Sequence, residues 1–375
     1  MRFIHTADWQ IGMKAAHVGT AAETVRDERL QAARRVVKLA EQARAEFVVL
    51  AGDTFENNGV DRILIQRTAD ILGKFGGQVY LLPGNHDALD PCSIWEHRAW
   101  ASHDNLRVLD KAEPVDVPGG ILYPCPVHEE HSSRNPVQWI KAANSPRIAV
   151  GVAHGTVEGL QLEEPEYPIP RDAPTLAGLD YIALGHWHSY ATYPDSDNVV
   201  RMAYSGTHEP TKFGERDSGN VLLVDIEARG EHPVLTPMKT GRLSWTVIEQ
   251  ELRQPGDLAR VSSMVEKLED PASTLLDLRI KGVLWADESQ ELSRIREISQ
   301  SRFLFSRLDD SCIVPYPDDE SWVSGLPAGS LRDAALRLSE LADPSYPGER
   351  LPGTSFETAS RALLELYALV SEVSK

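Results

Sequence analysis

Five apolar, strand-like runs in the first half of the chain each end in polar side chains, and this arrangement constrains the fold most strongly. The runs are "MRFIHTA", "FVVLAG", "QVYLLPG", "RIAVGVA" and "DYIALG". The polar residues that follow them are, in chain order, Asp8, Asp53, Asn85, His86, Asp87, His154, His186 and His188. Because strand ends in a packed α/β sheet converge on one crevice, we expect these distant residues to meet there.

Helical stretches alternate with the apolar runs in this part of the chain. Residues 21–45 and 60–75 carry apolar side chains at roughly helical spacing, whereas the later strands are separated mostly by loops or short helices. The pattern favours a sandwich of two mixed sheets flanked by helices over a single parallel sheet. We therefore predict an α/β fold, with its first domain over residues 1–240.

The character of the sequence changes near residue 240. "LSWTVIEQEL", a helix at 257–269, "TLLDLRIKGVL", a helix at 287–300 and "FLFSRLDD" together predict a small β-α-β-α-β domain over 241–312. Residues 313–375 are predicted to hold linkers and C-terminal helices. The expected parts are Pro- and Gly-rich connections at 313–329 and 343–355, a helix at 330–342 and an amphipathic helix at 356–373.

Composition excludes several classes of protein. The formal net charge of -18 argues against a broad basic surface that would bind nucleic acid unaided, although residues 1–100 are near neutral, with 12 basic and 13 acidic side chains. The three cysteines are widely spaced, odd in number and in no Cys-x-x-Cys pair, so neither a disulfide framework nor a zinc knuckle is indicated. No signal peptide or bilayer-spanning run is recognisable, so we expect a cytoplasmic protein without a membrane partner.

The polar residues at the strand ends have the chemistry of a metal site. Carboxylate and amide oxygens combined with imidazole suit manganese, iron or zinc. A carboxylate can bridge two cations about 3.5 to 4 Å apart in two-metal phosphoester hydrolysis. We expect Asp53 to be the bridge and His86 the proton donor.

Each of these features has an ordinary structural explanation when taken alone. Asp8 could cap a turn, "GNHD" could be a turn, and His186 and His188 could share a strand face. Their occurrence together, all after apolar strands, favours the metal site. His5 is expected to pack within its strand and His208 to serve a loop. The helix predicted at 21–45 also carries several basic residues, which we expect to form a solvated face. They are Arg26, Arg29, Arg34, Arg35 and Lys38.

These motifs resemble those of the calcineurin-like metallophosphoesterases. Within that superfamily, "FIHTADWQIG", "GDTFENN", "LPGNHD", "GHWHS" and "YSGTHEPTKFGERDSGNVLLVDI" are similar to the SbcD-type DNA repair exonucleases and their YhaO-like relatives. The resemblance covers residues 1 to about 226. It implies a metal-dependent nuclease that cuts DNA from an end, with endonuclease activity left open, and a small capping domain over 241–312 that helps to shape the DNA cleft.

The resemblance also implies a ligand set and partners. Metal 1 would be held by Asp8, Gln10, Asp53 and His188. Metal 2 would be held by Asp53, Asn85, His154 and His186. His86 would contact the scissile phosphate and the leaving group, and Asp87 would orient it. The implied partners are DNA, an SbcC-like coiled-coil ATPase engaged through the C-terminal helices, and a second copy of the chain engaged through N-terminal helices.

Gln10 departs from the family pattern, which has histidine at this position. An amide oxygen is a weaker donor than imidazole and is more readily replaced by solvent. We therefore predict that metal 1 binds less tightly than metal 2 and that the site works with two divalent ions, most readily manganese in excess.

Two other functions fit the same residues. The first keeps the metal site and changes the substrate to a nucleotide, a cyclic nucleotide or a phosphoprotein, because substrate choice lies in the capping domain and loops. The second is a non-catalytic scaffold whose site has begun to decay at Gln10, but every other expected ligand and the proton donor are present.

Overall fold

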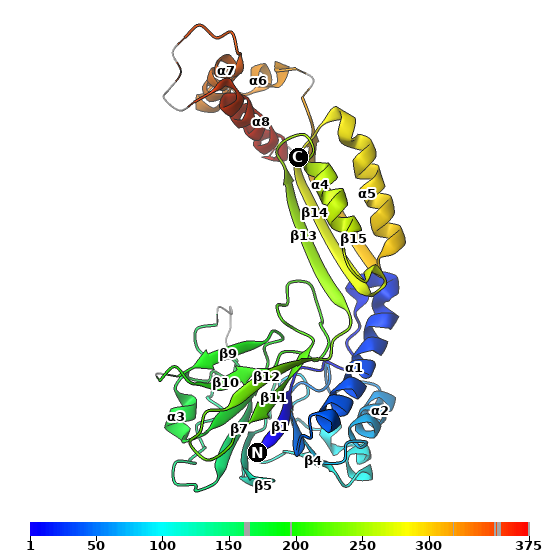
Figure 1. The fold of residues 1–375 in the computed structure, drawn as a ribbon, viewed down its shortest axis with the longest axis vertical. Helices are drawn as coiled ribbons and strands as arrows, with labels where there is room; N and C mark the ends of the chain where they lie inside the picture. The colour runs from blue at the N-terminus through cyan, green and yellow to red at the C-terminus, as the bar shows by residue number, and fades with distance from the viewer. Residues whose placement is uncertain (161–165, 196, 318, 349, 351–353, 374–375) are drawn as a thin grey trace. The chain divides into compact units, whose positions relative to one another are not determined.

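The computed structural model describes residues 1–160, 166–195, 197–317, 319–348, 350 and 354–373 (Figure 1). The chain divides into two compact units, Met1–Ser244 and Trp245–Lys375, which are described separately. The predicted connections at 313–329 and 343–355 include residues 318, 349 and 351–353, which lie outside the described residues. Within the described part of the chain, every helix is too short or too polar to cross a membrane.

The first unit contains two six-stranded mixed sheets, which confirms the predicted fold class. The strands of the first sheet are β1 (Arg2–Thr6), β2 (Phe47–Ala51), β3 (Gln78–Leu82), β4 (Leu106–Val108), β11 (Asn220–Asp225) and β12 (Val234–Lys239). Their order is β12-β11-β1-β2-β3-β4. Strands β1 to β4 are parallel, and β11 lies antiparallel to β1, with Arg2 opposite Asp225.

The second sheet of this unit has the order β5-β6-β7-β8-β10-β9. Its strands are β5 (Val115–Val117), β6 (Gly120–Cys125), β7 (Ile148–His154), β8 (Tyr181–Gly185), β9 (Ala191–Pro194) and β10 (Val200–Tyr204). Strands β6, β7, β8 and β10 are parallel. The carboxyl ends of β7 and β8 therefore lie at one edge, as those of β1, β2 and β3 do in the first sheet.

The central strands β2, β7 and β8 are almost continuously apolar and fully buried, because both faces of each sheet are covered there. Phe3, Val49, Val150 and Tyr181 belong to the buried layer between the sheets. Figure 1 shows two helices on one side of the first unit and a short helix on the other. They are α1 (Ala22–Gln42), α2 (Arg62–Leu72) and α3 (Ala173–Ala177). The unit also contains the short 3-10 helices η1 (Ala16–Ala21), η2 (Ile94–Glu96) and η3 (Arg98–Ser102).

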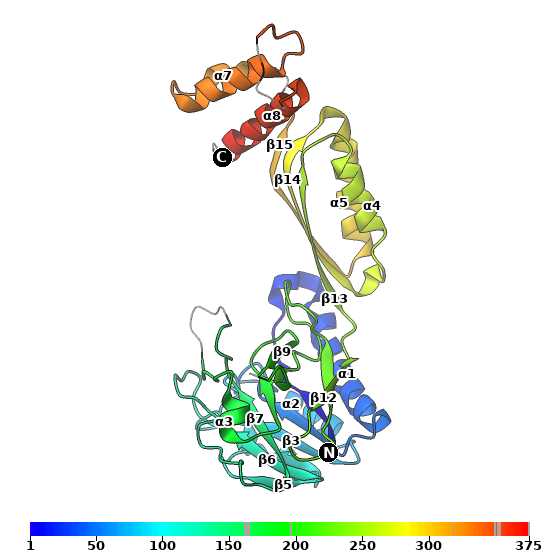
Figure 2. The same ribbon diagram turned by 60° about the vertical axis from the view of Figure 1, so that its left-hand side comes forward.

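The second unit begins with a β-α-β-α-β segment, in agreement with the sequence pattern. Its elements are β13 (Ser244–Leu252, whose first residue belongs to the first unit), α4 (Asp257–Glu266), η4 (Pro271–Ser273), β14 (Thr274–Leu284), η5 (Ala286–Glu288), α5 (Ser289–Arg302) and β15 (Phe305–Pro315). The sheet order is β13-β14-β15. Figure 2 shows α4 and α5 along one face of this sheet. Leu258, Leu278 and Ile295 belong to the buried core.

Three helices follow the sheet of the second unit: α6 (Ser321–Gly325), α7 (Ser330–Ala342) and α8 (Phe356–Val373). The bounds of α7 and α8 match the predicted helices at 330–342 and 356–373. Helix α6 lies in a segment predicted as a connection, and the Asp319 carboxylate accepts the backbone N–H of Ser321 at its start, at 2.8 Å. Val323, Ala335 and Leu363 pack together, so these helices share a small core.

Candidate metal centre

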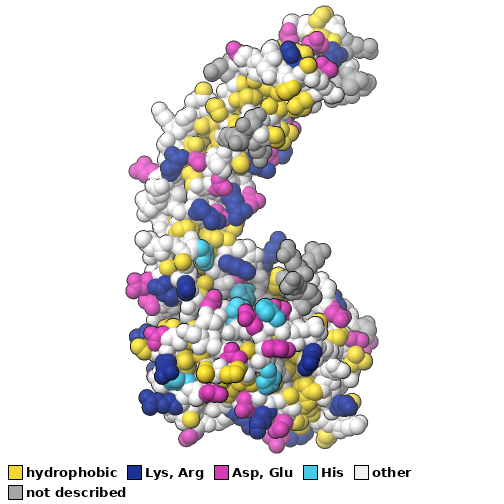
Figure 3. Space-filling view, turned by 180° about the vertical axis from the view of Figure 1, so that it is seen from behind, with side chains coloured by type: hydrophobic (Ala, Val, Ile, Leu, Met, Phe, Trp, Pro, Cys, Tyr) yellow, Lys and Arg dark blue, Asp and Glu magenta, His cyan; other side chains and the backbone are white. Residues whose placement is uncertain are grey.

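The predicted polar residues at the strand ends meet at the edge where the two sheets come together. The His186 backbone N–H donates to both carboxylate oxygens of Asp8, at 2.9 and 3.1 Å. The Nε2 atom of His154 lies 3.4 Å from Oδ2 of Asp53. Both contacts join the first sheet to the second. Figure 3 shows histidine and acidic side chains gathered on one face of the first unit.

Three groups in this cluster lie close enough together to hold one metal ion. Asp8, Asp53 and His154 are buried, and each offers a ligand atom within 4.8 Å of the others. The Nε2 atom of His154 also lies 2.9 Å from Oδ1 of Asn85, and the same oxygen lies 3.2 Å from Nδ1 of His186. A divalent cation of moderate hardness suits this mixture of carboxylate, amide and imidazole donors.

The tautomer of His154 supports this assignment. Its Nδ1 donates to the Ala51 carbonyl at 2.9 Å, so in the neutral ring the lone pair is on Nε2. That lone pair faces Oδ1 of Asn85, which is also an acceptor. Two acceptors at 2.9 Å require a proton or a cation between them. Nε2 of His154 and Oδ1 of Asn85 therefore fit a divalent metal ion bound at the position expected for metal 2.

His188 is held by a carboxylate that sequence reasoning missed. Its Nδ1 lies 3.0 Å from Oε1 of Glu215 and 3.0 Å from Oγ1 of Thr211. Burial alone would lower the pKa of His188, but Glu215, Asp8 and Asp53 together outweigh burial and raise it. A carboxylate on one ring nitrogen fixes the tautomer and leaves the other nitrogen to bind a metal.

Gln10 lies beside the expected bridging ligand. Its side-chain Nε2 donates to Oδ2 of Asp53 at 3.0 Å, and its backbone N–H donates to the Asp53 carbonyl at 3.0 Å. The amide therefore competes for an oxygen that the predicted metal 1 would use. This contact is consistent with weaker binding at metal 1, which remains a prediction.

Backbone conformation at the site is unusual for residues with side chains. Asp8, Gln10, Asp53 and His186 have φ angles of 55°, 47°, 52° and 106°. Few non-glycine residues adopt positive φ, and such residues concentrate at functional sites. The backbone is also bonded across these turns, because the Asp8 N–H donates to the Gly52 carbonyl at 3.1 Å.

Glycines precede three of the predicted ligands because there is no room for a side chain. A Cβ on Gly52 would lie 2.1 Å from Nδ1 of His154, and one on Gly84 would lie 2.2 Å from Oδ1 of Asp53. A Cβ on Gly185 would lie 1.9 Å from the Ala51 carbonyl oxygen. These contacts are far shorter than van der Waals distances, so the Gly-Asp, Gly-Asn and Gly-His pairs have a steric cause.

His86 is exposed at the edge of the cluster, with its backbone N–H on Oδ1 of Asp53 at 3.0 Å. Its ring Nδ1 lies 3.1 Å from the carbonyl oxygen of Glu56, which accepts the ring proton. Asp87, expected to orient His86, instead accepts the backbone N–H groups of Gly84 and Phe55 at 2.7 and 3.0 Å. The orienting group on the His86 ring is thus the Glu56 carbonyl, and Asp87 ties two loops together.

Burial sets the charge states of the carboxylates in the cluster. It raises the pKa of Asp8 to about 6 and that of Asp87 to about 7, the latter with help from the Asp53 charge. At Asp53 burial acts in the same direction, but His154 and His86 together outweigh it and lower the pKa. Burial alone would lower the pKa of His154, whereas Asp53 and Asp8 raise it to about 9. Burial lowers the pKa of His186 to about 3.

Arg29 corrects the expectation of a solvated Arg-rich helix face. Its side chain is 1% exposed, and its guanidinium donates to the Trp9 carbonyl at 2.8 Å through Nε and to the Glu209 carbonyl at 2.8 Å through Nη1. Burial lowers its pKa to about 10. The Arg29 side chain therefore anchors the loop that carries Asp8 and Gln10 to helix α1. Arg35 is partly buried and bonds Glu209 at 3.0 Å, whereas the remaining members, Arg26, Arg34 and Lys38, are exposed.

The two other histidines behave as expected. Nδ1 of His5 lies 2.9 Å from the Tyr181 hydroxyl within the sheet sandwich. His208 is buried in its loop, stacked on Trp9 with ring centroids 4.6 Å apart, and its Nε2 lies 2.9 Å from the Arg29 carbonyl oxygen.

Comparison with known proteins agrees with this geometry. A model of the calcineurin-like phosphoesterase family matches residues 1–190. The chain is 23% identical over 343 residues to the uncharacterized metallophosphoesterase YhaO of Bacillus subtilis strain 168, covering 83% of this chain and 81% of the relative. It is 20% identical over 259 residues to the SbcD subunit of the nuclease SbcCD from Staphylococcus epidermidis, covering 60% and 66%.

A similar solved structure is the crystal structure of TT1561 of Thermus thermophilus. It is 14% identical, and the match covers 64% of this chain and 98% of that chain with a TM-score of 0.42.

Proposed function

Because the chain belongs to the calcineurin-like phosphoesterase family, we propose that it is a two-metal-dependent phosphodiesterase that degrades DNA from an end. Phosphoester hydrolysis follows from the family. The observation that carries the proposal is the convergence of the predicted metal ligands at the sheet edge. Direct contacts join Asp8, Gln10, Asp53, Asn85, His154 and His186, and His188 lies near enough to Asp8 and Asp53 to interact with their charges.

Two divalent ions bound there supply positive charge for the phosphate and lower the pKa of water. The groups of the chain set the geometry around them. Asp53 contacts a member of each proposed ligand set, because its Oδ2 lies 3.4 Å from Nε2 of His154 and accepts a hydrogen bond from Nε2 of Gln10 at 3.0 Å. His86 is exposed, so its ring can reach a phosphate oxygen. Because its Nδ1 bonds the Glu56 carbonyl, a proton carried on Nε2 can be given to the leaving oxygen.

DNA is the proposed substrate for two reasons. The motifs of residues 1–226 resemble the DNA repair exonucleases, and the Staphylococcus epidermidis relative is named as part of a nuclease. We assign residues 1–240 to the nuclease domain, 241–312 to a capping domain and 313–375 to the linker and C-terminal helices. The proposed metal is Mn²⁺ and the proposed location is the cytoplasm, where a repair nuclease of this type meets DNA.

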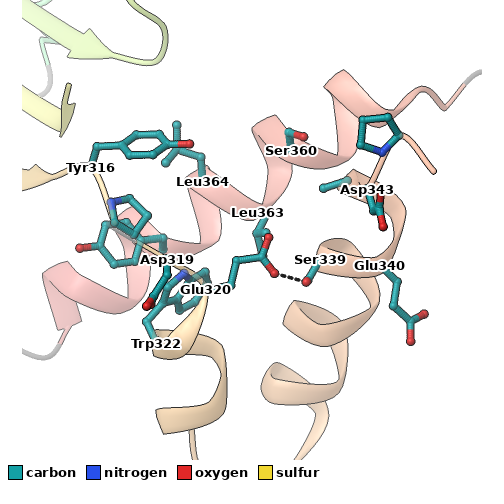
Figure 4. A pocket seen from close by; sticks show the side chains of 14 residues that line it. Tyr316, Asp319, Glu320, Trp322, Ser339, Glu340, Asp343, Ser360, Leu363 and Leu364 are labelled. Atoms are coloured by element: carbon teal, nitrogen blue, oxygen red, sulfur yellow. Dashed lines mark hydrogen bonds between the residues drawn. The ribbon is translucent and has the colours of Figure 1, made fainter. Parts of the chain in front are cut away.

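We propose that the C-terminal helices dock an SbcC-like coiled-coil ATPase. Leu369 on α8 is 60% exposed, and Leu331 on α7 is 49% exposed. Figure 4 shows a pocket of about 610 Å³ in the second unit. The labelled lining residues are Tyr316, Asp319, Glu320, Trp322, Ser339, Glu340, Asp343, Ser360, Leu363 and Leu364. Apolar walls and several carboxylates suit an amphipathic helix that carries basic residues. Leu369→Glu should abolish co-elution with such an ATPase.

We also propose a homodimer formed through α2 and the segment that contains η2 and η3. Ile63 on α2 is 59% exposed. It lines a groove of about 920 Å³ that also includes Cys92 and Ile94. Light scattering of Ile63→Asp beside the unchanged protein tests this surface, since a charged side chain there should give monomers.

The nuclease proposal is tested by degradation of end-labelled linear duplex DNA in the presence of Mn²⁺. His86→Ala should lower the rate by about 10² to 10⁴-fold, because it removes the proposed proton donor. Its Mn²⁺ binding should stay unchanged. The matched control is His232→Ala, which removes an exposed histidine from the connection between β11 and β12. This connection lies at the amino-terminal end of β1, opposite the site.

Two outcomes would contradict the proposal. If the manganese-loaded protein cleaves a small phosphodiester such as bis(p-nitrophenyl) phosphate but leaves DNA intact, the substrate is a nucleotide or another small phosphoester. If purified protein binds no Mn²⁺ at all, the non-catalytic scaffold becomes the better account.

A further inference from the structure

We propose that Glu166 is a positioning residue, whose carboxylate holds the amide oxygen of Asn85 toward metal 2. Sequence reasoning did not single out Glu166, because it lies in a loop and not at a strand end. The inference rests on the two-metal site of the proposed function, since Asn85 is one of the ligands proposed there.

The contacts of the Asn85 amide divide cleanly between its two ends. Its Nδ2 donates to Oε2 of Glu166 at 3.2 Å. Its Oδ1 lies 2.9 Å from Nε2 of His154 and 3.2 Å from Nδ1 of His186. A carboxylate ion accepts hydrogen bonds and donates none, so only the NH₂ end of an amide can face it. Glu166 therefore selects the orientation in which Asn85 presents its oxygen to the histidines.

The Glu166 carboxylate is itself held in place from two directions. Its other oxygen, Oε1, contacts Nδ1 of His131. The Glu166 backbone is bonded to Thr156 just beyond β7, with the Glu166 N–H donating to Oγ1 at 3.2 Å and the Thr156 N–H donating to the Glu166 carbonyl at 2.9 Å. The Glu166 side chain is 21% exposed. This support fixes the carboxylate before any ligand arrives.

Loss of this carboxylate should weaken metal binding by a specific route. Without Glu166, the Asn85 amide can rotate by half a turn and direct its NH₂ group at the histidines. That group repels a cation and donates no electron pair. Groups that orient a metal ligand in this way typically contribute about 10 to 100-fold in metal affinity.

The experiment is a calorimetric titration of Mn²⁺ into the metal-free full chain. Glu166→Ala should weaken the tighter site by about 10 to 100-fold. Glu166→Gln should retain most of the affinity, because its amide oxygen can still accept the Asn85 N–H. The matched control is Glu158→Ala, which removes an exposed glutamate nearby in the same part of the chain and should leave the titration unchanged.

The Asn85→Asp variant separates a loss of amide orientation at residue 85 from general damage to the loop that carries Glu166. In Asn85→Asp, the two oxygens of residue 85 are equivalent, so nothing remains to be oriented. Adding Glu166→Ala to this variant should leave Mn²⁺ affinity unchanged or raise it, because it also removes a like charge. Thermal melts of the metal-free variants verify that each is folded.

Three results would overturn the inference. They are Glu166→Ala binding Mn²⁺ like the unchanged protein, Glu166→Gln losing as much affinity as Glu166→Ala, or the same loss in the Asn85→Asp background. The titration involves no DNA. Failure of the nuclease proposal would appear as intact Mn²⁺ binding without DNA degradation, so the two failures are distinguishable.

Discussion

Asp8 in the first unit and Asp277 in the second are both completely buried, but of these two only Asp277 is paired with arginine. Asp277 on β14 accepts hydrogen bonds from Arg279 at 2.7 Å and from Arg307 at 2.6 Å. Within the described part of the chain, the Asp8 carboxylate forms no ion pair with lysine or arginine, and it accepts the His186 backbone N–H instead. The two carboxylates therefore differ in the kind of countercharge that the chain supplies: Asp277 has two arginines, whereas the charged group near Asp8 is His154, which can lose its proton.

The difference is also visible in the pKa values. At Asp277 burial acts to raise the pKa, but the bonds from Arg307 and Arg279 outweigh it and lower the pKa. At Asp8 burial prevails and raises the pKa to about 6. A buried carboxylate without a lysine or arginine partner is suited to bind a cation from solution, whereas one paired with arginine stabilises the fold. Four predictions test this distinction.

The largest difference should come from neutralising one carboxylate in each unit. Asp53→Asn should bring manganese-dependent DNA degradation to background and sharply reduce Mn²⁺ binding, because it removes the proposed bridging charge. Asp277→Asn should leave both properties unchanged. Calorimetric titration and the DNA assay measure them. Equal Mn²⁺ binding by Asp53→Asn and the unchanged protein would contradict the proposed role of Asp53 as a metal ligand.

Acid should weaken Mn²⁺ binding, because protons compete with the metal for its ligands. The pKa of His154 is raised to about 9 and that of Asp8 to about 6, so binding displaces a proton from His154 below pH 9. Each displaced proton changes the affinity by about tenfold per pH unit. The expected gain from about pH 6 to about pH 8 is thus about 100-fold, measured by titrations at several pH values. Affinity that is independent of pH would contradict the assignment of His154 as a ligand.

For stability the order of the two carboxylates should be reversed: the loss of Asp277 should destabilise the fold, whereas the loss of the Asp8 charge should not. In metal-free protein, Asp277→Ala should destabilise the second unit by about 1 to 3 kcal/mol, because it removes buried hydrogen bonds. Asp8→Asn should cause no loss, since burial already disfavours the Asp8 charge and asparagine can still accept the His186 N–H. Hydrogen exchange should accelerate in β14 and β15 of the first variant only. Faster exchange near β1 in Asp8→Asn would show that its charge also stabilises the fold.

Gln10→His should give the smallest effect. Imidazole is a stronger donor than an amide oxygen, so Mn²⁺ affinity at metal 1 should rise by about tenfold, equivalent to about 1.4 kcal/mol. Gln31→His, on the exposed face of α1, is the matched control. If metal 1 already binds more tightly than metal 2 in the unchanged chain, the interpretation of Gln10 is wrong.

The sequence predicted the fold well where the determining pattern is local. Helices α7 and α8 have the predicted bounds because apolar residues recur at helical spacing within each. Strand β14 matches "TLLDLRIKGVL" residue for residue. Strand ends led to the other predicted ligands by the same kind of reasoning, because parallel strands end at one edge, whereas Gln10 came from the resemblance to the metallophosphoesterases. Their binding of metal stays a prediction.

Residues whose roles depend on distant partners were missed. Glu215 and Glu166 lie in loops, and nothing in the neighbouring sequence indicates that they reach His188 and Asn85. Arg29 lies among exposed charges on α1, but its partner Glu209 is 180 residues away in the chain. A periodicity within one helix carries no information about carbonyl groups that arrive from such a distance.

The pairing of β1 with β11 also sets an order of events during protein synthesis. The ribosome releases β1 first, whereas β11, its antiparallel neighbour, ends at Asp225. At about 5 to 20 residues per second, β1 waits roughly 10 to 45 s for that neighbour. Until then one side of β1 presents unpaired backbone groups, which can pair with another nascent chain. A gene fragment ending at residue 190 would make this exposure permanent, so such a fragment should aggregate on expression.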